Sequence, residues 1–191
     1  ASRLLGKPLP ERVSGIDLME KLVILSVKQN YKIFFLGAKE EVVNNVVQQY
    51  STKYGSAIIA GYRNGYFTNE EEPPIARQIA ASGADILFVA ITSPKKEIFL
   101  NTYKHIINVP FIMGVGGSFD VVSGLVTRAP LWMQNSGLEW LFRIYQEPGR
   151  LWKRYLYTNT VFIYLVLRAK IASFKRSKKT DLEMELGAEI E

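Results

Sequence analysis

The chain of 191 residues contains no cysteine and only one histidine, His105. The absence of cysteine excludes disulfide bonds and thiolate metal sites. A single histidine argues against a histidine-rich metal site and against a Ser-His-Asp triad. The longest apolar run, Val161–Leu167, is far shorter than the roughly 20 residues that a membrane-spanning helix needs. The chemistry of this protein must therefore rest on other side chains.

Common nucleotide-binding fingerprints are missing as well. The turn at Gly114–Asp120 lacks the third glycine of G-x-G-x-x-G, because Phe119 stands there, and no Gly-Lys-Ser/Thr of a P-loop follows. This argues against an oxidoreductase or a methyltransferase on a nucleotide-binding core, which stays the second hypothesis. The sequence has no D-x-D motif that would hold a divalent ion on a nucleotide-sugar diphosphate. We expect no metal and no bound cofactor.

What the sequence does contain is an alternation of short apolar runs with segments of helical periodicity. The expected strands are 32–36, 57–60, 85–91 and 111–115, and the expected helices are 14–29, 40–54, 69–82 and 95–106. This order predicts an α/β fold, a Rossmann-like open parallel sheet with flanking helices. Ligands bind beyond the carboxyl ends of such strands, which end here at the loops Gly37, Gly61–Tyr66, Thr92–Glu97 and Gly114–Asp120.

The net charge of +6 is concentrated late in the chain. Residues 128–179 hold 11 Lys/Arg and 2 Glu, whereas residues 180–191 hold five acids and no base. We expect an α/β core over residues 1–130, a helical appendage over 131–174 with helices at 134–146 and 151–174, and a disordered tail over 175–191. No nucleic-acid reading motif accompanies the basic segment, so we expect no nucleic-acid partner.

The stretch Phe111–Asp120, FIMGVGGSFD, predicts a buried strand, a glycine turn and a helix capped by Ser118. Gly116 and Gly117 would let a ligand approach the backbone closely. A helix start there would attract a phosphate. Asp120 either helps to cap the helix or serves a site, where it would bind sugar hydroxyls or act as a base.

Two groups of cations are further candidates. The turn Ser93–Glu97, SPKKE, places lysines at a strand end, where they either neutralise a phosphate or form a solvated helix start. Arginines spaced by seven and four residues would share one helix face approximately and suit a diphosphate, unless they form a solvated face. Aromatic neighbours favour a membrane interface over simple solvation. The residues are Arg143, Arg150 and Arg154, with Trp140, Trp152, Tyr155 and Tyr157.

Five motifs occur in one order: GKPLPERVSGIDLM, SPKKE, MGVGGSFDVVSG, RAP and GLEWLFRIYQEPGRLWKRY. Together they closely resemble the WecG/TagA/CpsF glycosyltransferases over residues 3–168. The resemblance implies transfer of an N-acetylmannosamine-type sugar, or a related hexose, from a UDP-sugar to a polyprenyl-diphosphate-linked acceptor. It implies a metal-independent, inverting enzyme at the inner face of the bacterial membrane, which makes teichoic acid or another cell-surface polysaccharide. An appendage that touches the membrane surface belongs to the same expectation.

The resemblance also assigns residues by position. The acid of the glycine turn falls on Asp120, the expected catalytic residue. Many members have glutamine in the turn where this chain has Lys96, so the sugar stays open. Lys153 is an alternative to the last appendage arginine. The expected substrate-binding residues are Arg12, Lys96, Glu97, Gly116, Gly117, Arg143, Arg150 and Arg154.

In the family, a Pro-Asp-Gly-like turn before PLPERV supplies the proposed catalytic base, and this chain starts after that point. We therefore expect a chain that keeps much of the site but lacks the base and the first strands of the sheet. The alternative is a truncated nucleotide-sugar or membrane-surface binding module without catalysis. Self-association stays open.

Overall fold

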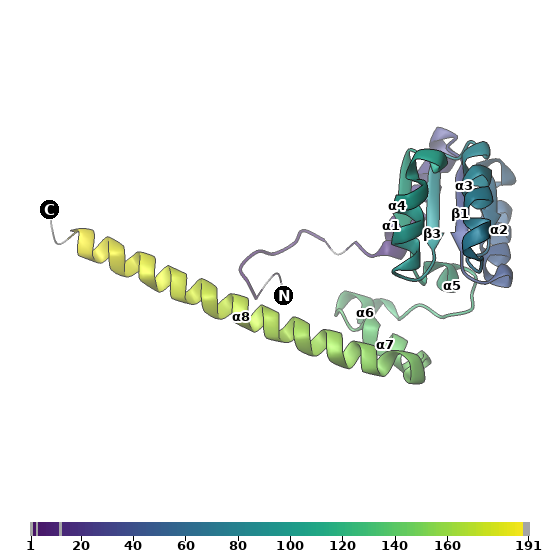
Figure 1. Ribbon diagram of the computed structural model, residues 1–191. Coiled ribbons are helices and arrows are strands. Elements are labelled where there is room, and N and C mark those ends of the chain that lie inside the picture. Colours follow the sequence, from purple (N-terminus) through teal and green to yellow (C-terminus); the bar gives the residue numbers. More distant parts are fainter. Residues whose placement is uncertain (1, 3, 12, 189–191) are drawn as a thin grey trace. The chain divides into compact units, whose positions relative to one another are not determined.

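The computed structural model describes residues 2, 4–11 and 13–188, which divide into two compact units. Val13–Arg128 form one, here called the α/β unit; residues 1–12 and 129–191 form the other, here called the helical unit. Both are drawn in Figure 1. The α/β unit contains α1 (Gly15–Gln29), β1 (Ile33–Gly37), α2 (Glu40–Tyr54), η1 (Ser56–Ile58), β2 (Ile59–Arg63), η2 (Asn69–Glu71), α3 (Glu72–Ala81), β3 (Ile86–Ala90), α4 (Lys95–Ile107), β4 (Phe111–Gly114) and α5 (Ser118–Val122).

The four strands form one parallel sheet in the order β2-β1-β3-β4. Helices cover both faces, so the inner strands are continuous apolar runs. Every residue of β1 is buried. Its side chains alternate between two cores: Ile33 and Phe35 pack with α1, α2 and α5, whereas Phe34 and Leu36 pack with α3 and α4. The predicted Rossmann-like α/β architecture is confirmed.

Phe35 is the centre of the first core. Its ring lies 5.8 Å, between centroids, from each of the rings of Tyr50, Phe88 and Phe119. Tyr50 comes from α2, Phe88 from β3 and Phe119 from α5. Aromatic contacts of this kind add to the free energy gained from burial. The core therefore joins the short helix α5, which follows the glycine turn, to the centre of the sheet.

Gly37, the last residue of β1, lies close to the backbone of β3. Its φ is +131°, and an added Cβ would lie 2.5 Å from the carbonyl carbon of Ala90 in β3. The N–H of Ala38 donates to the carbonyl oxygen of Ala90 at 3.0 Å. Only glycine satisfies both the backbone angle and this contact.

The helical unit contains α6 (Leu131–Asn135), α7 (Glu139–Gln146) and α8 (Pro148–Ala188). The single helix expected at 134–146 is wrong: Gly137, with φ +73°, separates α6 from α7. Pro148 begins α8, a position where its missing N–H costs nothing. Residues 175–188, expected in a disordered tail, lie in α8, and 189–191 lie outside the described residues.

The α7 and α8 helices pack against each other, with the ring centroids of Trp140 and Tyr155 6.0 Å apart and Leu151 buried. Among the described residues, no helix combines the length and the hydropathy that crossing a membrane requires.

Replacing Gly37 with alanine tests the contact with Ala90. The matched control is Gly55→Ala, because Gly55 has φ +87° but an added Cβ there meets no atom within 4 Å. We expect Gly55→Ala to lower the free energy of unfolding by about 1–2 kcal/mol through backbone strain alone. Gly37→Ala should cost roughly 1–3 kcal/mol more, because the new methyl group overpacks the backbone of β3. Urea denaturation measures both, and equal losses would contradict the contact.

Candidate functional site

The carboxyl ends of β1 and β3 form the topological switch point of the sheet. From β1 the chain crosses to β2 on one side, while β3 lies on the other, and ligands of open α/β sheets bind beside such a point. The loop after β2 joins the same place, because the N–H of Gly65 donates to the carbonyl oxygen of Ala38 at 2.9 Å. Backbone hydrogen bonds alone thus hold the carboxyl ends of β1, β2 and β3 together.

The two lysines that open α4 have different surroundings. The Nζ of Lys95 donates to the carbonyl oxygen of Phe67 at 2.5 Å and lies 4.0 Å from the centroid of the Phe67 ring. Lys95 therefore holds the loop after β2 by a hydrogen bond and a cation–π contact. Lys96 points elsewhere, toward Gly114 at the end of β4. The sequence did not separate these neighbours; the structure leaves Lys96 as the candidate for ligand binding.

Glu97 lies beside Lys96, with 3.1 Å between its Oε1 and the Nζ of Lys96. A hydrogen bond with the Ser93 side chain lowers the pKa of Glu97, and the Glu97 backbone N–H and Lys96 lower it further. The carboxylate is therefore charged near neutral pH and orients the ammonium of Lys96. Ser93, Lys96 and Glu97 form one polar cluster at the carboxyl end of the sheet.

The stretch Phe111–Asp120 differs from its prediction in two respects. Its strand β4, expected to be buried, lies at the edge of the sheet and is only partly buried, with Phe111 43% exposed. Ser118 does not cap α5; its hydroxyl donates back to the carbonyl oxygen of Val115 at 2.7 Å, and Gly117 is the N-cap. Gly116 has φ +52° and Gly117 has φ −76°, so the backbone requires glycine only at 116. With five residues, α5 is too short to offer a helix-dipole phosphate site.

Asp120 lies in the first turn of α5 and is half-buried. Its backbone carbonyl accepts hydrogen bonds from the N–H of Val126 at 2.9 Å and from the hydroxyl of Ser123 at 3.1 Å. These bonds fold the chain after α5 back onto the helix. Asp120 thus lies near the carboxyl end of the sheet, and its catalytic role stays a prediction.

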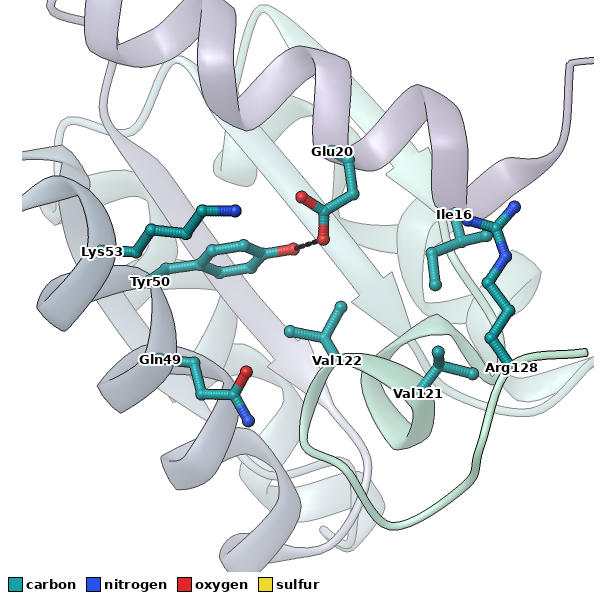
Figure 2. A pocket seen from close by; sticks show the side chains of 8 residues that line it. All are labelled: Ile16, Glu20, Gln49, Tyr50, Lys53, Val121, Val122 and Arg128. Carbon is teal, nitrogen blue, oxygen red and sulfur yellow. Dashed lines mark hydrogen bonds between the residues drawn. The ribbon is translucent and has the colours of Figure 1, made fainter. Parts of the chain in front are cut away.

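A hollow of about 410 Å³ opens between α1, α2 and α5 on the face of the first core. Figure 2 shows Tyr50 and Glu20 meeting on one side of it, with Val121 and Val122 opposite. The hydroxyl of Tyr50 donates to Oε1 of Glu20 at 3.0 Å. Burial, and then the charge of Glu20, raise the pKa of Tyr50 far above its ordinary value, so the hydroxyl stays protonated. No sequence motif indicated this hollow.

Arg128 closes one end of the hollow and ties the two ends of the α/β unit together. Its guanidinium lies 2.5 Å from Oδ1 of Asp17 and donates to the hydroxyl of Ser14 at 3.4 Å. Ser14 is the N-cap of α1, so the last residue of the unit is fixed to the start of its first helix. Arg128 belongs to the RAP motif, but the sequence does not reveal this role, because the partner Asp17 lies 111 residues away.

The helical unit carries the remaining candidates. Arg143 lies on α7 and is half-buried, whereas Arg150 and Arg154 belong to α8. The expectation of one shared helix face is therefore wrong, because a helix boundary at Glu147 separates the first arginine from the other two. The side chains of Arg150 and Arg154, and all of Arg12, lie outside the described residues.

No group of three or more His, Cys, Asp or Glu that would hold a metal ion occurs among the residues the structure describes.

Comparison with known proteins decides the family. The profile of the glycosyl transferase WecG/TagA/CpsF family matches residues 1–176, which include all of the α/β unit and much of α8. The chain belongs to this family. The resemblance drawn from the five motifs is thereby confirmed.

Two curated relatives of the family are similar to the chain, and both are named N-acetylglucosaminyldiphosphoundecaprenol N-acetyl-beta-D-mannosaminyltransferase. The one from Bacillus subtilis (strain 168) is 41% identical over 155 residues, which cover 81% of this chain and 59% of that relative. The one from Bacillus spizizenii (strain ATCC 23059 / NRRL B-14472 / W23) is 37% identical over 174 residues, which cover 91% and 66%. The chain thus spans less than two thirds of either relative.

For this family member, a double-mutant cycle tests the tie between Asp17 and Arg128. Their side chains are about a third exposed, so we expect a coupling energy of roughly 0.5–1 kcal/mol between Asp17→Asn and Arg128→Gln. Urea denaturation of the four proteins gives this value, and 1 M salt should weaken it. Lys21→Gln, an exposed charge removal on α1, should not couple to Arg128→Gln. Additive losses from the first pair would show that the contact adds no stability.

Proposed function

We propose that this chain belongs to a glycosyltransferase that moves an N-acetylmannosamine-type sugar, or a related hexose, from a UDP-sugar to a polyprenyl-diphosphate-linked acceptor. The product would enter a cell-surface polysaccharide such as teichoic acid. The observation that carries the proposal is the family match over residues 1–176, which extends through both units. The names of the two relatives describe mannosaminyl transfer to a lipid-linked N-acetylglucosamine, which supports the same substrate classes.

The proposed reaction is a single displacement with inversion at the anomeric carbon. A base removes the proton of an acceptor hydroxyl, the oxygen attacks the anomeric carbon, and UDP leaves with the electrons of the broken bond. Negative charge grows on the diphosphate as it leaves, so fixed cations lower the barrier. We assign this work to Lys96, without a metal ion. Arg143, Arg150 and Arg154 are assigned to binding either the leaving UDP or the diphosphate of the acceptor. Asp120 is assigned to the sugar end of the donor.

A second part of the proposal is peripheral association with the inner face of the bacterial membrane through α8. Four large apolar side chains of this helix lie within one stripe, at spacings of 4, 7 and 4 residues, and are 47–62% exposed: Trp152, Leu156, Ile163 and Leu167. Two of them, Trp152 and Leu156, line an apolar hollow of about 420 Å³ together with Lys153, Tyr157 and Thr160. Apolar stripes with aromatic and basic neighbours are typical of helices that lie in a lipid interface.

Substrate class is tested by calorimetry and a transfer assay. We expect the chain to bind UDP and not NAD, because the dinucleotide fingerprint is missing and cations lie at the strand ends. Excess EDTA should leave UDP binding unchanged. Transfer of N-acetylmannosamine from its UDP form to a lipid-linked N-acetylglucosamine would support the enzyme; UDP binding without transfer would favour the binding module. Binding of NAD in place of UDP would refute both.

Membrane association is tested with vesicles that contain phosphatidylglycerol. The chain should sediment with them, and the double substitution Leu156→Ser with Ile163→Ser should weaken partitioning roughly 10-fold or more through lost apolar burial. Ile98→Ser is the control, because Ile98 is 61% exposed but lies on α4 of the α/β unit. If the double variant partitions as well as the unaltered chain, the stripe is not the membrane contact.

A further inference from the structure

Gly114 is the last residue of β4. Its own backbone conformation does not require glycine, but a neighbouring side chain does. Its φ lies outside the left-handed region, so other residues fit the backbone there. An added Cβ would instead lie 2.9 Å from the Nζ of Lys96, 3.1 Å from its Cε and 3.3 Å from its Cδ. The outer half of the Lys96 side chain therefore fills the space that a side chain at position 114 would take.

This contact fixes where the ammonium of Lys96 lies. Lys96 starts from the first turn of α4, and its stem crosses to the end of β4, where the glycine turn begins. Its side chain is 22% exposed, so most of it is covered and part of it reaches solvent. Of the three N–H donors of the ammonium, the described contacts assign one to Glu97. Donors remain for an anionic ligand at the carboxyl end of the sheet.

We propose that Gly114 is a positioning residue that acts through Lys96. Because Gly114 has no side chain, it leaves open the space that the outer half of the Lys96 side chain occupies, here called the seat of Lys96. The ammonium held there binds a diphosphate. The inference rests on the proposed function, because that function brings a diphosphate to this edge of the sheet. The diphosphate belongs either to the nucleotide donor or to the lipid-linked acceptor, which share this chemistry.

The substitution Gly114→Ala tests the position of the Lys96 ammonium without removing its charge. In Gly114→Ala, the atoms that the new methyl group meets are the far end of a flexible side chain and not backbone. The protein can relieve the contact by moving the ammonium, so the fold and the charge are kept while the seat is lost. Lys96→Ala removes the charge and the stem together, so an alanine at 114 no longer meets the Nζ, Cε and Cδ of residue 96.

The experiment is a double-mutant cycle on binding, measured by calorimetry with UDP and with farnesyl diphosphate as separate probes, and with uridine as the probe that lacks phosphate. The proteins are the unaltered chain, Gly114→Ala, Lys96→Ala and the double variant. Lys104→Gln is the control, because it removes one exposed charge at the opposite end of the same helix. Thermal unfolding of each protein reports on the fold.

We expect Lys96→Ala to weaken diphosphate binding roughly 10-fold or more, as the loss of a charged hydrogen bond predicts. Gly114→Ala should weaken it about 3-fold in the Lys96 background and not at all in the Lys96→Ala background, with an unchanged melting temperature and unchanged uridine binding. A loss with UDP assigns the donor, and a loss with farnesyl diphosphate assigns the acceptor.

Three results would overturn the positioning role: no effect of Gly114→Ala on either diphosphate, an equal effect in both backgrounds, or an equal loss of uridine binding. If the unaltered chain binds neither diphosphate, the proposed function fails with it. If the chain binds UDP but the effects of Gly114→Ala and Lys96→Ala on binding are additive, the proposed function stands and this inference is refuted.

Discussion

The backbone contact between Gly37 and Ala90 is the constraint on which the rest of the α/β unit depends. It sets how closely the ends of β1 and β3 approach, and Ala38 and Gly65 then extend it by hydrogen bonds to the loop after β2. Because these hydrogen bonds join backbone groups, the positions of the strand ends do not depend on any side-chain rotamer. The helices α2 and α4 begin directly after these loops. The direction of α4, and with it the direction in which its lysines point, therefore depends on the loops.

At the start of α4, the adjacent lysines Lys95 and Lys96 have different surroundings. Successive residues of a helix point about 100° apart, so Lys95 meets the aromatic ring and carbonyl of Phe67, while Lys96 crosses to β4. The first cation stabilises a loop, and the second is the one that we propose binds a diphosphate. A shift of one residue in the register of α4 would put Lys96 where Lys95 lies and Glu97 where Lys96 lies, which is why the fixed loop before this helix matters for the site.

The sequence predicted the architecture because the inner strands β1 and β3 are buried on both faces and read as continuous apolar runs. It was less accurate for β2, expected at 57–60 and observed at Ile59–Arg63, since this edge strand is only partly buried and the apolar signal ends before the strand does. The separation of α6 from α7 could have been predicted from Gly137. The seat of Lys96 and the partners of Arg128 could not, because both depend on residues brought close only by the fold. Roles for Arg12, Asp120, Arg150 and Arg154 stay predictions.

Arg128 and Ser14 have a consequence for how the polypeptide is assembled. The α/β unit interrupts the sequence of the helical unit: the chain enters it after residue 12 and leaves it at residue 128. The hydrogen bond of Arg128 to Ser14 places that entry and that exit beside each other. An element whose ends adjoin is a natural insertion module. Residues 13–128 thus have the geometry that circular permutation demands, and a short peptide bridging residues 128 and 13 would turn the unit into a continuous ring that can be reopened at any exposed loop.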